Sequence, residues 1–233
     1  MTFKSVLEMF ARALRQTIAR PPNEAVSPLR PRSTTAARAS KETYPYGAPH
    51  SINAISTGIP RIPRTLADQA DRTARAVADC QGDDFEKLRL VYNYLDEYNK
   101  FVATFAVCKA GCSHCCKIDV DVTRVEALYI ERNTGKKMHR KRKHSTNHRT
   151  PCPMLASDGR CGIYEHRPFN CRTLHTLDDA SFCATPDVTH VIYGIPQQAK
   201  PRYGSDCYAQ MANILDGLNK GGEIKDIRNY FGQ

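Results

Sequence analysis

The strongest constraint on this 233-residue chain is the distribution of its ten cysteines. All but Cys80 lie between residues 108 and 207, and four of them fall in the run Cys108-Lys-Ala-Gly-Cys112-Ser-His-Cys115-Cys116. Thiols packed this closely in sequence are typical ligands of a soft metal ion or an iron–sulfur cluster. A second group follows, at Cys152, Cys161, Cys171 and Cys183.

The N-terminus and the hydropathy of the chain indicate the compartment in which these thiols work. The first residues contain no continuous apolar segment of a secretory signal, and no apolar run approaches the roughly 18–20 residues of a membrane span. We therefore expect a cytoplasmic protein without a membrane span. In a reducing cytoplasm, clustered cysteines are more often metal ligands than disulfides. Disulfides formed after export by an unrecognised route, and plain free thiols, are the alternatives.

Two regions of different composition divide the chain. Residues 1–64 combine an amphipathic helical pattern over 1–19 with a segment rich in proline, serine and arginine. Proline removes backbone donors, and a segment with so little apolar content cannot offset its conformational entropy by burial. We expect 1–64 to be an N-terminal amphipathic helix followed by a disordered linker. Residues 65–233 are then expected to form a cysteine-cluster metal-binding domain.

Apolar periodicity and capping signals predict helices in the second region. A helix is expected from about residue 65 to Gly82, and a second begins at Asp83 or Asp84. Thr123-Arg-Val-Glu126 is a capping box, and Gly135 is suited to end the helix that it begins. A last helix is expected near residues 205–218. The fold class is therefore mainly α with irregular cysteine-rich metal-binding loops and little β, and we expect no parallel sheet.

The cysteine spacing favours certain centres without fixing which thiols share one. Sulfurs two or three residues apart can face one centre from a tight loop, to which Gly111 gives backbone freedom. Adjacent Cys115 and Cys116 are expected to serve different centres. The spacing C-x3-C-x2-C is typical of [4Fe–4S] sites, whereas structural zinc more often shows paired C-x2-C motifs, of which this chain supplies one at Cys112–Cys115. Eight thiols suffice for two four-ligand centres, and the pairing stays open.

The charge of such a centre requires partners. Four thiolates around Zn2+ or around an oxidised [4Fe–4S] cluster leave about −2, which donors and cations near the ligands stabilise. Lys117, Arg167 and Arg172 lie close in sequence to cluster cysteines and are candidates for contact with the cofactor. The alternative is that these arginines pair with Glu165 or Asp178.

The run CKAGCSHCC, followed by CPMLASDGRCGIYEHRPFNCR, resembles the YkgJ-like cysteine-cluster family, which is described as a zinc- or iron-chelating domain with the pattern CxxxCxxCC. The second half of the resemblance is the signature C-x-I-Y-x-x-R-P-x-x-C-R. The resemblance covers about residues 105–185. It implies metal binding through Cys108, Cys112, Cys115, Cys116, Cys152, Cys161 and Cys171, with Cys183 as an eighth ligand. A related group, the flagellin lysine methylases, carries a similar motif and is associated with a [4Fe–4S] cluster.

The formal net charge of +10 is uneven, because the stretch Lys136–Arg149 carries seven Lys or Arg and no acid. Such a stretch is either a solvated loop or a contact for an acidic or nucleic-acid partner. Three functions follow. The first is a metal-binding protein holding an iron–sulfur cluster, [4Fe–4S] favoured, or zinc. The second is a cluster-dependent group-transfer enzyme, as the methylase resemblance suggests. The third is a metal-stabilised nucleic-acid-binding module.

Overall fold

The computed structural model describes residues 58–109, 111–139, 144–148, 150–185, 190–194 and 202–232, without the side chains of 202–204. The helix predicted over residues 1–19 and most of the predicted linker therefore lie outside the described residues. The last residues of that linker are described, and Ile59 and Ile62 pack against the helical core. Within the described residues, each helix is too short or too polar to cross a membrane.

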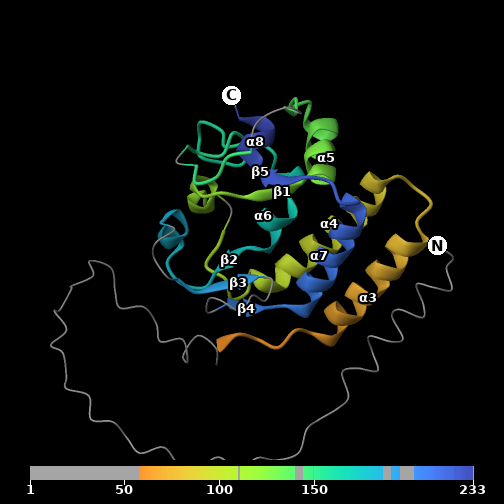
Figure 1. Ribbon diagram of the computed structural model, residues 1–233. Helices are drawn as coiled ribbons and strands as arrows, with labels where there is room; N and C mark the ends of the chain where they lie inside the picture. Colours follow the sequence, from red (N-terminus) through yellow and green to blue (C-terminus); the bar gives the residue numbers. More distant parts are fainter. Residues whose placement is uncertain are drawn as a thin grey trace, which may run out of the picture. The chain divides into compact units, whose positions relative to one another are not determined.

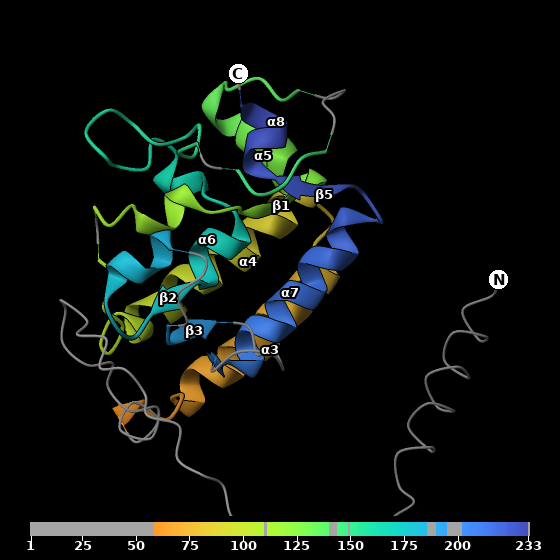
Figure 2. The same ribbon diagram turned by 60° about the vertical axis from the view of Figure 1, so that its left-hand side comes forward.

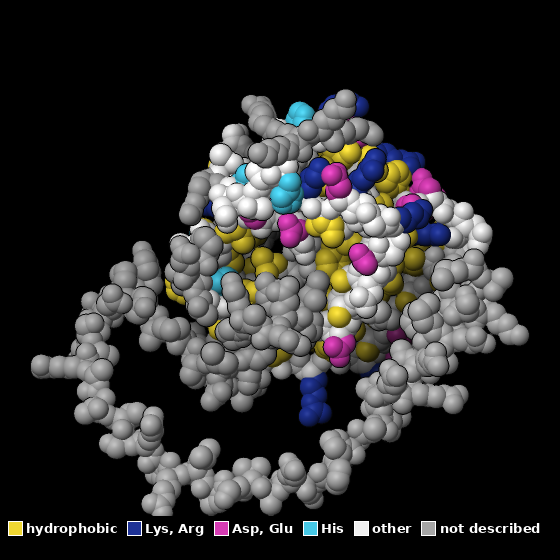
Figure 3. All heavy atoms as spheres, in the orientation of Figure 1, with side chains coloured by type: hydrophobic (Ala, Val, Ile, Leu, Met, Phe, Trp, Pro, Cys, Tyr) yellow, Lys and Arg dark blue, Asp and Glu magenta, His cyan; other side chains and the backbone are white. Residues whose placement is uncertain are grey.

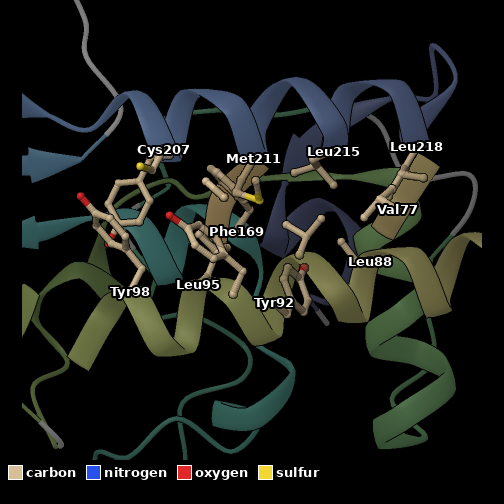
Figure 4. Close-up of a cluster of buried hydrophobic side chains, with 14 of the residues drawn as sticks. Val77, Leu88, Tyr92, Leu95, Tyr98, Phe169, Cys207, Met211, Leu215 and Leu218 are labelled. Atoms are coloured by element: carbon tan, nitrogen blue, oxygen red, sulfur yellow. The ribbon is translucent and has the colours of Figure 1, made fainter. Parts of the chain in front are cut away.

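Three helices form the scaffold of the domain. α3 (Arg64–Asp79), α4 (Asp84–Val102) and α7 (Asp206–Asn219) pack against one another (Figures 1 and 2). Leu88, Leu95 and Tyr98 recur on one face of α4 and are fully buried. Figure 4 shows this face directed toward Met211 and Leu215 of α7. The apolar periodicity that predicted the three helices is thus explained by their mutual packing.

The predicted capping signals set the helix ends. Asp83 is the N-cap of α4, where its carboxylate accepts from the backbone N–H groups of Phe85 and Glu86. The capping box at the start of α5 (Arg124–Thr134) is formed in both directions. Gly135 then ends α5 in the left-handed conformation, at φ 72°, which costs glycine little. These predictions are confirmed.

Strands are few and short, as expected for a mainly α fold. β1 (Asp121–Thr123) pairs antiparallel with β5 (Ile224–Asp226). β2 (His175–Thr176) pairs antiparallel with β3 (Ile192–Gly194). The expectation of no parallel sheet is wrong in one place, because β3 pairs in parallel with β4 (Arg202–Gly204). We expected no parallel sheet because the sequence shows no alternation of strands with long helices. Strands of three residues are too short to produce that pattern.

Short helices fill the space between the strands and the loops. They are η1 (His114–Lys117), η2 (Tyr164–His166), α6 (Phe169–Thr173), η3 (Ala180–Ala184) and α8 (Ile227–Phe231). α5 and α8 share a second apolar cluster, with Ile130, Met154 and Ile227 among its buried members. Cys152 and Cys161 pack against this cluster. The loop that carries them is therefore held by contact with apolar side chains.

One buried carboxylate joins α4, α5 and α6. Glu126 is 1% exposed and accepts hydrogen bonds from the hydroxyl of Tyr92 at 2.9 Å and from the N–H of Phe169 at 2.6 Å. It also accepts from the N–H of Thr123 at 2.9 Å, as the capping box requires. Because Phe169 begins the helix that carries Cys171, Glu126 fixes part of the second cysteine group to the scaffold.

We predict that Glu126→Ala lowers the free energy of unfolding by about 3 kcal/mol or more, because it leaves several buried donors without an acceptor. Arg132→Ala is the matched control on the same helix. Arg132 pairs with Asp83 at the surface, where such a pair contributes about 0–1 kcal/mol. Urea denaturation followed by circular dichroism measures both losses. Equal losses for the two variants would contradict the role given to Glu126.

Candidate metal centre

The first cysteine group follows α4 on a segment pinned to β2. The N–H of Val107 donates to the carbonyl of Thr176 at 2.9 Å, and the N–H of Thr176 donates to the Sγ of Cys108 at 3.2 Å. Gly111 has φ +88°, a conformation that favours glycine, and reverses the chain between Cys108 and Cys112. The backbone freedom predicted at Gly111 is therefore used.

Cys183 joins the first group through packing of two short helices. η1, which carries Cys115 and Cys116, packs against η3, which carries Cys183. Burial raises the pKa of Cys183 to about 12, and the neighbouring Cys108, Cys115 and Cys112 contribute to this rise. The packing of η1 on η3 thus brings Cys183 to the side of the first motif, where the charges of its thiols act on Cys183.

The second group is assembled from three segments. The N–H of Cys152 donates to the carbonyl of Cys116 at 2.7 Å, so this loop is tied to the end of the first motif. A bridge between Leu155 and Cys161 closes the loop on itself. Burial raises the pKa of Cys171 well above its usual range, and the thiols of Cys115, Cys152 and Cys161 raise it further.

Adjacent Cys115 and Cys116 lie where the two groups meet. A hydrogen bond from Cys116 lowers the pKa of Cys115 to about 7. The same hydrogen bond is the largest of several influences that raise the pKa of Cys116, with burial and the charges of Cys115, Cys152 and Cys171 adding to it. Cys115 thus acts on thiols of both groups. Apart from its neighbour Cys115, the thiols that act on Cys116 are Cys152 and Cys171, which belong to the second group.

All ten cysteines are free, including the eight candidate ligands. Of the metal-binding side chains in the described ranges, only Asp119, His148 and Asp226 bring three ligand atoms within 4.8 Å of one another. No three cysteine sulfurs in these ranges are that close. The sulfurs around a single tetrahedral zinc ion stand about 3.8 Å apart, given a Zn–S distance of about 2.3 Å. No three of the described thiols therefore stand as close together as a single tetrahedral ion requires.

Arg167 is a cation that acts on thiols of both cysteine groups. Burial is the largest influence on the pKa of Cys108 and Cys171 and raises both, and the guanidinium of Arg167 opposes it. The guanidinium lies 4.1 Å from the centre of the Tyr164 ring. Its Nε is buried without a hydrogen-bond partner; among the described side chains only His166 Nδ1 shares that state. A buried N–H beside electron-rich sulfurs fits a donor to a negatively charged thiolate-bound group.

Arg172 and Lys117 occupy different environments. Arg172 is 1% exposed, forms an ion pair with Asp96, and donates to the carbonyls of Arg167 at 2.8 Å and Glu165 at 2.6 Å. Its guanidinium also lies over the ring of Tyr92. These contacts hold the second motif in shape. Lys117 is exposed at the end of η1. Contact of either residue with a cofactor stays a prediction.

Sequence reasoning missed one residue of the site, because its partners are distant in the chain. Arg228 of α8 is 5% exposed and donates to the carbonyls of Cys116 at 3.0 Å, Ile118 at 3.0 Å and Thr150 at 2.8 Å. It closes the junction between the two cysteine groups from the C-terminal end. Nothing near Arg228 in the sequence marks it, since the second motif ends at Arg172, far earlier in the chain.

The basic stretch is described only in part. Lys136 and Lys137 are exposed beyond α5, and residues 140–143 and 149 lie outside the described residues. Figure 3 shows several Lys and Arg side chains on the surface over α5. An acidic or nucleic-acid partner for Lys136–Arg149 stays a prediction.

Comparison with known proteins identifies the same region. Residues 107–189 match the model of the family described as "CxxCxxCC: putative zinc- or iron-chelating domain". All eight candidate cysteines fall inside this match, so the cysteine-cluster resemblance expected from the two motifs is confirmed. No curated protein and no solved structure matches the chain. The match shows similarity to a zinc- or iron-chelating domain and does not distinguish the two metals.

The raised thiol pKa values make metal binding release protons. Cys108, Cys116, Cys152, Cys171 and Cys183 all have raised pKa values and are protonated at pH 7, yet they bind metal as thiolates. We predict that Zn2+ added to reduced, metal-free protein releases protons at pH 7 and still does so near pH 9. Ordinary thiols, with pKa about 8.5, are mostly ionised there. Titration in weakly buffered solution measures the release, and its loss at about pH 9 would contradict the burial of these thiols.

We predict that Arg167→Gln weakens metal binding about 10- to 100-fold, because it removes the positive charge that acts on Cys108, Cys115 and Cys171. Arg160→Gln is the matched control, since Arg160 lies on the loop between Cys152 and Cys161 and is exposed, with Asp158 as its partner. Competition with a chromophoric chelator for Zn2+ measures the affinities, and circular dichroism checks folding. Equal affinities for the two variants would remove Arg167 from the site.

Proposed function

We propose that this chain is a cytoplasmic iron–sulfur protein with two [4Fe–4S] centres. The proposal is supported by eight free thiols from five segments, among which Cys183 feels the charges of the first motif and Cys171 those of Cys152 and Cys161. We assign Cys108, Cys112, Cys115 and Cys183 to one set, and Cys116, Cys152, Cys161 and Cys171 to the other. Four thiolates are the usual ligand set of a [4Fe–4S] cluster.

Two features favour a cluster over zinc. The spacing C-x3-C-x2-C at Cys108, Cys112 and Cys115 is typical of [4Fe–4S] sites. The sulfurs also stand too far apart to meet at a single tetrahedral ion without rearrangement. A cluster that carries its thiolates on several iron atoms suits this wider spacing.

The surrounding residues would tune such a centre. Arg167 supplies positive charge and an unpaired N–H beside the thiols, which stabilises a negatively charged group. The apolar cluster behind Cys152 and Cys161 limits the approach of water to the second set. When bound, a cluster of this type supplies one-electron transfer, with a potential set by charge, hydrogen bonds to sulfur and exposure.

Anaerobic purification of the full chain, followed by iron and acid-labile sulfide determination, tests the proposal. We expect about eight iron and eight sulfide per chain, which is four of each per cluster. Cys183→Ser and Cys161→Ser should each remove about half, and the two changes together should remove nearly all. Cys80→Ser, at the end of α3, is the matched control and should lose none.

Each other metal and sulfide content has a definite meaning. Two zinc ions per chain without sulfide would replace the iron–sulfur proposal and retain metal binding. Loss of all metal in either single variant would overturn the division into two sets. Protein with less than about half a metal ion per chain, and with its thiols paired as disulfides, would contradict metal binding altogether.

The two alternatives expected from the sequence have tests of their own. A spectral change of the metal-loaded protein on addition of S-adenosylmethionine would favour the group-transfer enzyme. Binding to mixed DNA or RNA that weakens steeply with salt would favour the nucleic-acid-binding module, because phosphate contacts release counterions.

A further inference from the structure

A cavity beside α8 contains polar side chains that the metal centres do not use. Its volume is about 610 Å3, and Ser145, His148, Asn229 and Phe231 are among the residues that line it. Lys136 and Lys137 line the same cavity, which therefore carries positive charge. This cavity is where the described part of the basic stretch meets the C-terminal helix.

Three side chains in this region form a continuous hydrogen-bonded relay. The Oγ of Ser145 lies 2.9 Å from the Nε2 of His148. The Nδ1 of the same ring lies 2.9 Å from the Oδ1 of Asp119. A hydroxyl next to one imidazole nitrogen and a carboxylate next to the other is the arrangement of a nucleophile, a general base and the group that orients the base. Such relays are recognised by geometry on unrelated folds.

Both ends of the relay are fixed by further hydrogen bonds. Asn229 is 2% exposed; its Oδ1 accepts from the N–H of Ser145 at 2.9 Å, and its Nδ2 donates to the carbonyl of Ser145 at 2.7 Å. Asp119 accepts from the backbone N–H of His148 at 2.9 Å and of Asn147 at 2.6 Å. The serine and the histidine are thus held through their backbone groups by Asn229 of α8 and by the Asp119 carboxylate, rather than by loop conformation alone.

Asp226 is a second carboxylate near His148, so a metal site is an alternative interpretation of these residues. Asp119, His148 and Asp226 have ligand atoms within 4.8 Å of one another. The oxygens of Asp226, however, already accept from the N–H groups of Val120 and Arg228. The guanidinium of Arg228 also lies 3.1 Å from Asp226 Oδ2. This fixed cation neutralises the carboxylate and opposes the approach of a metal ion, so the proton relay is the better interpretation.

The hydroxyl of Ser145 has two acceptors in reach, and one of them activates it. Its Oγ lies 2.8 Å from Asn229 Oδ1, which already accepts from the serine N–H. When Nδ1 of His148 carries the proton toward Asp119, Nε2 is unprotonated and accepts the hydroxyl proton. The carboxylate of Asp119 favours this tautomer, as it would in any such relay.

We propose that Ser145 and His148 are the catalytic residues of an ester- or thioester-hydrolysing site, with Asp119 as the positioning residue. The substrate class is an acyl ester or thioester that carries a negatively charged group, which Lys136 and Lys137 attract into the cavity. The site uses none of the candidate cysteine ligands, but it adjoins the metal centres, because Arg228 lines the cavity and also donates to the carbonyl of Cys116.

The atoms balance in two steps. In the first, the Ser145 hydroxyl proton moves to His148 Nε2, the Oγ–acyl bond forms, the bond to the leaving alcohol or thiol breaks, and that group takes the proton. In the second, water gives a proton to Nε2 and attacks the acyl carbon. The Oγ–acyl bond then breaks, Ser145 regains its proton, and the acid leaves.

A fluorophosphonate probe tests the site in the full, metal-loaded chain. The Ser145 Oγ–phosphorus bond forms, fluoride leaves, and the hydroxyl proton passes to His148. We expect mass spectrometry to find the label on Ser145, and Ser145→Ala and His148→Ala to lower labelling at least tenfold. Ser157→Ala changes an exposed serine of a neighbouring loop and should label like the original protein. Metal content and circular dichroism show whether each variant is folded.

Two further readouts separate catalysis from a structural role. Asp119→Asn should change the pH profile of labelling in protein that keeps its fold, because it alters which imidazole nitrogen carries the proton. Lys136→Gln combined with Lys137→Gln should lower hydrolysis of the succinate half-ester of 4-nitrophenol more than that of 4-nitrophenyl acetate. Absence of label on Ser145, or full labelling of folded His148→Ala, would overturn the proposal.

Discussion

Hydrogen bonds between buried charged side chains and backbone groups hold the cysteine loops of this protein in place. The loops have little regular secondary structure, so their backbone groups need other partners. Arg172 binds two carbonyls of the segment that precedes α6, and Arg228 binds the carbonyl of Cys116. Glu126 accepts the first N–H of the same α6. Each of these charges is nearly inaccessible to water, where bonds to charged groups are strong and costly to lose.

These hydrogen bonds, together with the helical core, explain why cysteines from distant segments of the chain lie near one another. Helices α3, α4 and α7 supply a rigid apolar core, and the loops that carry the cysteines are fastened to it at a few polar points. Packing of η1 on η3 and the hydrogen bond between Cys152 and Cys116 then bring distant segments to the C-terminal end of the first motif. The result is a set of thiols whose pKa values are mostly raised by burial, with Arg167 as the cation beside them. Such a set favours a bound positive centre, which removes the protons and offsets the charge.

The sequence predicted the elements that depend on local rules. The helices followed from apolar periodicity, and Asp83, Thr123 and Gly135 marked their ends, because caps involve residues only a few positions apart. Two groups of cysteines were visible in the sequence, but the approach of Cys183 to the first motif could not be predicted, since it depends on packing between η1 and η3. The short strands β1 and β5 pair residues about a hundred positions apart, and nothing in three-residue strands reports such a partner.

The arginines show the same limit at the level of single residues. Arg167 and Arg172 both lie close to cluster cysteines in the sequence, which predicts that both contact a cofactor. Their surroundings in the structure differ. Arg167 keeps a buried Nε without a partner, whereas Arg172 meets Asp96 from α4, an acid 76 positions away. Arg228, which no motif marks, contacts the cysteine segment directly through a carbonyl. Tertiary contacts, rather than spacing, decide which cation faces the thiols.

X-ray absorption at the iron and zinc edges of the anaerobically purified chain shows whether bound metal joins the two thiol groups. We expect iron with a first shell of sulfur and a second shell of iron, in amounts that fall when either group is altered. A first shell of nitrogen and oxygen, or protein free of both metals with its fold intact, would contradict the claim that metal joins them.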